Sequence, residues 1–195
     1  MLPAGDTELV QIVDAALANA ARRAGAWLAC RAGCTQCCHG AFGISMLDAE
    51  RLRATMAALH ASDPAAAGAI EQRAQQWIAE HAADFPGDAK TGILGSSKAD
   101  QAAFEEFAND APCPALDPAT GHCGVYAGRP MTCRVFGPPV RNEGGALGHC
   151  ELCFQGAPTA VVAACEMQVP HELEARILNE MGDARETVVA YALVR

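Results

Sequence analysis

The chain of 195 residues carries 23 acidic and 14 basic side chains, which gives a formal net charge of −9. Nucleic-acid binding requires clusters of Lys and Arg that neutralise phosphates, and because no segment has such a cluster we expect no nucleic-acid partner. No segment approaches the roughly 20 consecutive apolar residues that span a bilayer, so we also expect no association with a membrane.

Three helices are predicted in the first half of the chain. Apolar residues recur with helical spacing over residues 7–28. Ser45 is a favourable N-cap for a second helix over residues 46–60. Asp63-Pro64 combines an N-cap with a first-turn proline, and it predicts a third helix over residues 64–84. The apolar stripes of these helices predict a helical core.

The sequence after these helices is broken by glycine and proline. Residues 86–97 are predicted to form a loop, and Ser97 is predicted to cap a short helix that ends near Asn109. Residues 112–153 contain too little apolar material to fold around a core of their own. Because metal binding can supply the folding free energy that such a segment lacks, we expect metal ligation to hold it.

The C-terminal part of the chain returns to a helical pattern. A helix is predicted after Pro170, and Gly182 is expected to end it. Residues 186–194 fit either a strand or a helix. The fold class is therefore predicted to be mainly α, with a helical body and an irregular cysteine-rich metal-binding lobe.

The length of the chain predicts its domain organisation, and its N-terminal residues predict its compartment. It suffices for an ordinary hydrophobic core, so we expect a single cysteine-cluster domain over residues 1–195, with a metal lobe built from residues 30–38 and 112–153. The N-terminal residues lack the basic and apolar segments of a secretory signal. We therefore expect a cytoplasmic protein, in which thiols stay reduced and structural disulfides are rare.

The 10 cysteines are the most informative residues of the chain. Four of them lie close together, at positions Cys30, Cys34, Cys37 and Cys38. Thiolates are soft ligands that select zinc, copper(I) and iron–sulfur centres, and the Cys-x3-Cys and Cys-x2-Cys spacings suit zinc or iron–sulfur ligation. Because the side chains of consecutive residues are expected to diverge, Cys37 and Cys38 favour two neighbouring sites or one multinuclear cluster.

A second series of cysteines follows the predicted helices. It reads Cys113-Pro-Ala-Leu-Asp117, Gly121-His-Cys123, Arg129-Pro130-Met-Thr-Cys133-Arg134 and Cys150. Together with residues 30–38, this series resembles the bacterial zinc- or iron-chelating cysteine-cluster family that is written CxxCxxCC or YkgJ-type. The resemblance covers residues 30–153, and it departs from the family signature in the three residues between Cys30 and Cys34 and in Thr35, where glycine is usual.

The resemblance implies both metal ligands and a cofactor. Eight cysteines match the family pattern, which suits two four-cysteine sites or one cluster with spare thiols. A flagellin lysine methylase of this family resembles an iron–sulfur protein, which favours a [4Fe–4S] cluster, with zinc as the alternative. Cys153 is left open between ligand and bystander, and Cys165 is interpreted as a buried apolar residue. The eight implied ligands are Cys30, Cys34, Cys37, Cys38, Cys113, Cys123, Cys133 and Cys150.

Two arginines, Arg129 and Arg134, flank Cys133. Four thiolates on Zn²⁺ or on an oxidised [4Fe–4S] core leave a net charge of about −2, so these arginines are predicted to lie beside the metal centre and offset that charge, the alternative being that both are surface residues. Three histidines adjoin cysteines, and we interpret them as neighbours of the site rather than as ligands. They are His39, His122 and His149.

These features predict a cytoplasmic metal-binding protein that holds an iron–sulfur cluster or zinc for redox chemistry, sensing or metal delivery. Two other functions stay open. One is a protein-modifying enzyme akin to the flagellin lysine methylase, although no catalytic residues stand out in the sequence. The other is a structural zinc module whose helices bind a partner protein. The sequence does not determine the oligomeric state.

Overall fold

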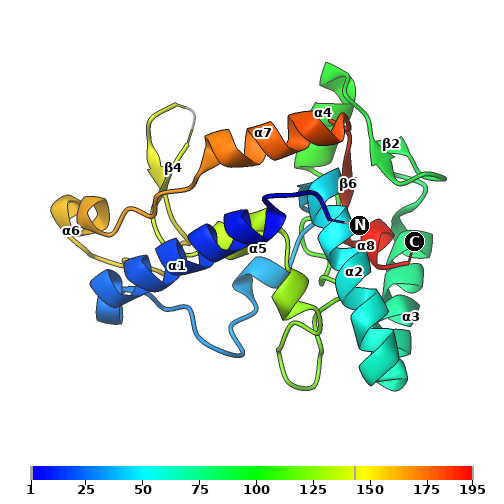
Figure 1. The fold of residues 1–195 in the computed structure, drawn as a ribbon, viewed down its shortest axis with the longest axis horizontal. Helices are drawn as coiled ribbons and strands as arrows, with labels where there is room; N and C mark the ends of the chain where they lie inside the picture. Colours follow the sequence, from blue (N-terminus) through cyan, green and yellow to red (C-terminus); the bar gives the residue numbers. More distant parts are fainter. Residues whose placement is uncertain (1, 143, 195) are drawn as a thin grey trace. The chain divides into compact units, whose positions relative to one another are not determined.

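The computed structural model of the protein describes residues 2–142 and 144–194 (Figure 1). In this part of the chain the fold contains eight α-helices and six strands of two or three residues. The predicted fold class, mainly α, is therefore confirmed. None of the helices in the described residues combines the length and apolar character needed to cross a bilayer.

The chain divides into two compact units, and each contains helices as well as cysteines. Unit 1 comprises Met1–Leu2, Ala32–Pro130 and Asp183–Arg195, and unit 2 comprises Pro3–Arg31 and Met131–Gly182. The boundary between Arg31 and Ala32 separates Cys30 from Cys34, although both belong to one sequence cluster. The single cysteine-cluster domain, with its separate helical body and metal lobe, stays a prediction.

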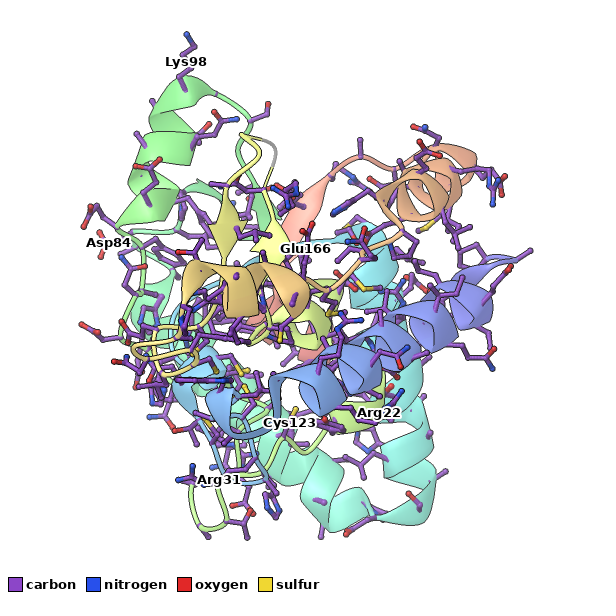
Figure 2. All side chains as sticks on the ribbon, turned by 90° about the vertical axis from the view of Figure 1, so that its left-hand side faces the viewer. Arg22, Arg31, Asp84, Lys98, Cys123 and Glu166 are labelled. Carbon is purple, nitrogen blue, oxygen red and sulfur yellow. The ribbon has the colours of Figure 1, made fainter. Side chains whose placement is uncertain are left out.

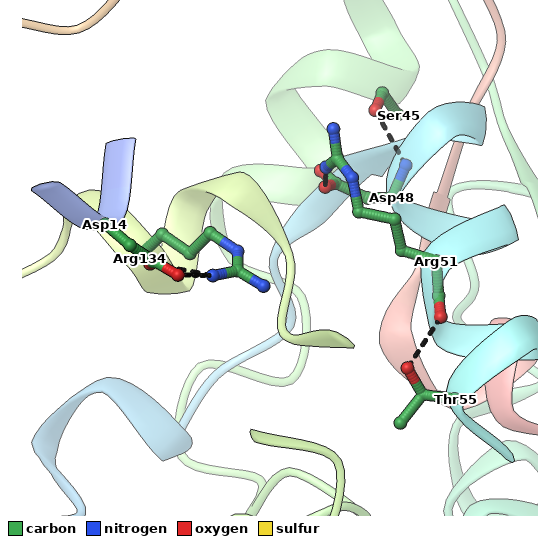
Figure 3. Close-up of polar contacts among 6 residues, drawn as sticks. All are labelled: Asp14, Ser45, Asp48, Arg51, Thr55 and Arg134. Carbon is green, nitrogen blue, oxygen red and sulfur yellow. Dashed lines mark hydrogen bonds and ion pairs between the residues drawn. The ribbon is translucent and has the colours of Figure 1, made fainter. Parts of the chain in front are cut away.

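Two capped helices, α2 (Met46–Ser62) and α3 (Pro64–His81), form the main part of unit 1 and run side by side in Figure 1. The Ser45 hydroxyl caps α2 by accepting a hydrogen bond from the Asp48 amide at 3.2 Å (Figure 3). The Asp63 carboxylate caps α3 in the same way, and a proline occupies the first turn. Both predicted helix starts are confirmed, because these caps are local features of the sequence.

The main core of unit 1 joins α2 and α3 to the C-terminal helix α8 (Val189–Leu193). Two of its buried members, Ala115 and Val125, come from the segment 112–153, so part of that segment shares the helical core. Cys113 and Cys123 pack against the same core from positions that are half-buried. The helices thus position two of the predicted ligands.

A small antiparallel sheet completes unit 1, with the strand order β1-β6-β3-β2. Its strands are β1 (Gly43–Ser45), β6 (Glu186–Val188), β3 (Ile93–Leu94) and β2 (Gly87–Asp88). The residues predicted as a loop, 86–97, therefore contain the hairpin β2–β3. Residues 186–194, which the sequence left open, form a strand that leads directly into α8.

Helix α4 (Lys98–Glu105) begins at the predicted capping residue, Ser97, which forms a reciprocal capping box with Asp100. Lys98, at the start of this helix, points away from the protein in Figure 2. The helix is four residues shorter than predicted. Turns follow it, and Ala108 has a positive φ of 50°, a conformation that a helix does not permit.

Unit 2 is organised around α1 (Asp6–Ala24), which contacts three other helices. Helix α1 ends before the predicted residue 28 because Gly25 adopts a φ of 51°, and a short 3₁₀ turn, Gly25–Trp27, replaces the last predicted turn. Gly182 ends the C-terminal helix of this unit with a left-handed conformation, as predicted. The remaining elements are α5 (Met131–Val135), β4 (Val140–Arg141), β5 (Leu147–Gly148), α6 (Thr159–Ala164) and α7 (His171–Met181).

Candidate metal centre

The structure places the cysteines in two groups of five. All ten lie in the described part of the chain and are present as thiols rather than as disulfides. We call Cys34, Cys37, Cys38, Cys113 and Cys123 the unit 1 thiol group. We call Cys30, Cys133, Cys150, Cys153 and Cys165 the unit 2 thiol group. The eight predicted ligands are therefore divided between the units, five in unit 1 and three in unit 2.

Backbone hydrogen bonds bring the first cysteine motif to the second within unit 1. A 3₁₀ turn, Gln36–Cys38, presents the adjacent pair of cysteines, and the Cys38 amide bonds the Thr35 carbonyl at 2.8 Å. The Cys113 amide donates to the Cys38 carbonyl, also at 2.8 Å. This contact places Cys113 next to the pair although 75 residues (113 minus 38) separate them in the chain.

The loop that follows Cys113 turns back and carries Cys123 toward the same place. Leu116 and Cys123 form an isolated antiparallel bridge, and the Gly124 amide donates to the Ala115 carbonyl at 2.8 Å. Cys123 is labelled in Figure 2, where sulfur atoms are yellow.

Cys34 belongs to the same neighbourhood of unit 1 through its flanking residues. A Cβ on Gly121 would meet the Gly33 carbonyl oxygen at 3.3 Å and the Thr35 methyl at 3.5 Å. The loop before Cys123 therefore packs against the residues on both sides of Cys34.

The adjacent thiols of Cys37 and Cys38 interact directly. The Cys38 thiol donates a hydrogen bond to the Cys37 sulfur, and chiefly for this reason the pKa of Cys37 falls to about 6. The same hydrogen bond, together with burial and the nearby charges of Cys37, Cys113 and Cys123, raises the pKa of Cys38. The two side chains therefore do not diverge as expected, because they leave one 3₁₀ turn and share a thiol–thiol hydrogen bond.

The same charges also affect the pKa values of Cys113 and Cys123, two further members of the unit 1 thiol group. Burial raises the pKa of Cys113 to about 11, and the charges of Cys123 and Cys37 contribute to the rise. Burial also raises the pKa of Cys123, with a further contribution from Cys37. Four sulfurs of unit 1 thus lie within electrostatic range of one another: Cys37, Cys38, Cys113 and Cys123.

The cation of Arg129 lies near these four sulfurs. Arg129 is 8% exposed, and its guanidinium carbon lies 4.0 Å from the centroid of the Tyr126 ring, a cation–π contact. Its positive charge lowers the pKa values of both Cys37 and Cys123. Arg129 therefore lies where it can offset the charge of bound thiolates, and its role beside a metal stays a prediction.

The second predicted arginine, Arg134, belongs to unit 2 and is 1% exposed. Its Nη1 donates to both carboxylate oxygens of Asp14, at 2.7 and 2.8 Å (Figure 3). This ion pair fastens α5 to α1. The charge of Arg134 is thus shared with a carboxylate, and its predicted role beside a metal stays untested.

Two cysteines of the unit 2 thiol group form a close pair. The sulfurs of Cys30 and Cys153 lie 3.9 Å apart and share a hydrogen bond. The sequence left Cys153 open as a ligand, although its Cys-x2-Cys spacing with Cys150 suits a zinc site. Cys165 is buried at 2% exposure, as its interpretation as an apolar packing residue requires.

The donors of both groups suit a soft metal by their chemistry. Among residues 2–142 and 144–194, however, no three Cys, His, Asp or Glu side chains are placed to ligate one ion together. Two histidines beside the cysteines bond backbone carbonyls instead: His39 Nδ1 lies 3.0 Å from the Thr35 oxygen, and His149 Nδ1 lies 3.0 Å from the Cys150 oxygen. The thiols of each group therefore lie near one another, but in the described residues they do not surround a single ion position.

The comparison with known families agrees with this donor set. The family model described as "CxxCxxCC: Putative zinc- or iron-chelating domain" matches residues 29–153, a range that includes every cysteine except Cys165. No curated protein and no solved structure matches the chain. Since the match covers more than half of its residues, the chain belongs to the CxxCxxCC family of zinc- or iron-chelating domains.

Proposed function

We propose that this protein binds an iron–sulfur cluster through the unit 1 thiol group. The proposed ligands are Cys37, Cys38, Cys113 and Cys123, and Cys34 is an alternative ligand. The observation that supports this most is the backbone geometry that gathers these cysteines: the Cys113 amide bonds the Cys38 carbonyl at 2.8 Å, and the bridge between Leu116 and Cys123 returns the chain to the same place. A cluster offers several irons, each of which takes one thiolate, so its ligands need not surround one point.

The surroundings of these thiols support the same function. Four thiolates around an oxidised [4Fe–4S] core carry a net charge of about −2, which a guanidinium offsets. Arg129 already lowers the pKa values of two of the sulfurs, and it is held in place by the Tyr126 ring. Cys113 and Cys123 pack against the helical core of unit 1, so the site is anchored on one side.

Zinc is the second candidate, and the Cys37–Cys38 pair favours it. Two hydrogen-bonded thiols lie close enough to bind one ion, and a tetrahedral zinc site needs only two more sulfurs. Cys113, whose amide bonds the Cys38 carbonyl, and Cys123 would supply these two sulfurs.

The compartment and role follow from the chemistry of the ligands. Thiolate ligation requires reduced cysteines, which supports the cytoplasm as the site of action. A thiolate-bound cluster in such a compartment is suited to electron transfer, sensing of oxidants or metal delivery, and we propose a role in this group.

The test is the metal content and visible absorption of the full chain purified without oxygen. We expect iron and acid-labile sulfide in equal amounts and a brown protein. Cys113→Ser should lose the cluster, whereas the matched control Cys165→Ala should retain it, because Cys165 lies outside the unit 1 thiol group. A colourless protein with one zinc ion, lost in Cys113→Ser, would select the second candidate. Unchanged metal in Cys113→Ser would contradict both.

A further inference from the structure

The unit 2 thiol group contains thiols that the proposed unit 1 centre does not use. Cys30 and Cys153 come from opposite ends of the family match, and 123 residues separate them in the chain. Their sulfurs nevertheless lie 3.9 Å apart in the structure. The tertiary fold of unit 2, and not local spacing, therefore produces this pair.

The distance between these sulfurs matches one edge of a mononuclear thiolate site. Ligands placed tetrahedrally at about 2.3 Å from a zinc ion lie about 3.8 Å from one another. A disulfide bond would instead bring the two sulfurs to about 2.05 Å. Cys30 and Cys153 are thus spaced to bind one ion together in the positions they already hold.

Cys150 supplies a third thiol from the turn that ends at Cys153. The Cys153 amide donates to the Cys150 carbonyl at 2.9 Å, so both side chains leave the same tight turn. Ligand pairs of zinc sites commonly have this Cys-x2-Cys spacing. Both cysteines are buried, at 6% and 2% exposure, which keeps water from competing for the ion.

Gly137 connects the pair to the segment that carries Cys133. The Cys150 amide donates to the Gly137 carbonyl at 3.2 Å, and a Cβ on Gly137 would lie only 2.7 Å from the Cys30 sulfur. Cys133, in α5, precedes Gly137 by four residues. The segment that carries Cys133 therefore comes close to the Cys30 sulfur and to Cys150, and Cys133 is the cysteine that it can contribute as a fourth donor.

An apolar shell encloses the buried side of these thiols. Cys150 and Cys153 pack in one cluster with Ala24 and Phe154. Cys30 is exposed, which leaves one side through which an ion can enter. Charges interact more strongly in such a water-poor environment, which favours a thiolate-bound divalent ion over a set of separate thiols.

We propose that Cys30, Cys133, Cys150 and Cys153 form a second metal centre, a mononuclear thiolate site of unit 2 that takes zinc or another soft divalent ion. It is separate from the unit 1 centre, and it adds Cys153 to the ligands that the family resemblance implies. Cys150 and Cys133 reach the ion by side-chain rotation, while the Cys30–Cys153 pair stays in place. The inference extends the proposed function to a second site, and it can fail while that function stands.

The test titrates the reduced, metal-free full chain with Co²⁺ as the probe, without oxygen. Tetrahedral cobalt thiolates absorb strongly in the visible, so each centre reports its own occupancy. Four variants are compared with the unmodified chain: Cys30→Ser and Cys153→Ser at the proposed site, Cys113→Ser in unit 1, and Cys165→Ala as the packing control. Cys30→Ser is the leading variant because an exposed residue tolerates substitution, and far-UV circular dichroism verifies the fold of each.

We expect two thiolate-bound cobalt ions per chain. Cys30→Ser and Cys153→Ser should each lose one of them and retain the other, Cys113→Ser should show the opposite loss, and Cys165→Ala should bind as the unmodified chain does. Full binding in both Cys30→Ser and Cys153→Ser would overturn the inference and leave the unit 1 centre intact. Loss of both ions in Cys30→Ser as well as in Cys113→Ser would also overturn it, because it would mean one shared centre.

Discussion

Replacement of Gly137 by alanine tests how closely the unit 2 site is packed. Gly137 has a φ of 120°, in the region that L-residues avoid, and a new Cβ would lie 2.7 Å from the Cys30 sulfur. Ordinary contacts of carbon lie at about 3.5–4.0 Å, so the sulfur would have to move by about 1 Å. Gly137→Ala should therefore displace one member of the thiol pair.

A matched glycine separates the cost of the contact with the sulfur from the cost of the backbone strain. Gly145, in the same unit, also has a positive φ, of 80°, but a Cβ there would meet nothing within 4 Å. Gly145→Ala should therefore cost only the backbone strain, about 1–3 kcal/mol. Gly137→Ala should cost that strain and a further 1–3 kcal/mol, roughly, for overpacking against the sulfur.

The assay is thermal unfolding of the reduced, metal-free chain, followed by circular dichroism. One kcal/mol shifts the midpoint of a protein of this size by about 2–4 °C. Gly137→Ala should unfold at least about 2 °C below Gly145→Ala, and it alone should bind less Co²⁺. Equal midpoints with equal cobalt binding would refute the close approach of Gly137 to Cys30.

Three further predictions concern unit 1. Cys38→Ala removes the hydrogen bond to Cys37, so the pKa of Cys37 should rise from about 6 and its alkylation by iodoacetamide at pH 7 should slow. Cys38→Ser keeps a hydrogen-bond donor and should slow the alkylation less. Equal rates in both variants would contradict the assigned hydrogen bond. Leu52→Ala, at 0% exposure in the main core, should destabilise the chain by about 2–5 kcal/mol in urea unfolding. The control is Ile12→Ala in α1 of unit 2, which at 40% exposure should change stability by less than about 0.5 kcal/mol; similar losses in both variants would refute the core assignment. Removal of metal by a chelator should leave most of the far-UV helical signal, because α2 and α3 pack on apolar residues; its complete loss would show that the metal nucleates the fold.

The sequence predicted best what depends on neighbouring residues. The caps at Ser45, Asp63 and Ser97 marked helix starts that the structure confirms, since a cap needs only the next three residues. Helix ends were less accurate, because Gly25 with its positive φ ended α1 early, and α4 stopped at Glu105, before the positive φ of Ala108. The strand at residues 186–188 could not be recognised, because it pairs with β1, more than 140 residues away.

At the candidate site, too, the sequence predicted what depends on local spacing and not what depends on tertiary contacts. The pattern of the cysteines pointed to the family, which the family match confirms, while the assignment of individual ligands stays a prediction. It did not show that Cys30 and Cys34, four residues apart, belong to different units. Nor did it show that Cys30 meets Cys153, because this contact exists only once α1 and the 131–182 segment have packed together.

The most direct test of the central claim, that thiolates bind the metal, is X-ray absorption at the metal edge of the anaerobically purified full chain. We expect a first shell of sulfur at about 2.3 Å. An iron edge with an additional iron–iron distance would indicate the cluster of unit 1. A zinc edge with sulfur alone would indicate a mononuclear thiolate site. A first shell of oxygen or nitrogen at about 2.0–2.1 Å, without sulfur, would contradict the account.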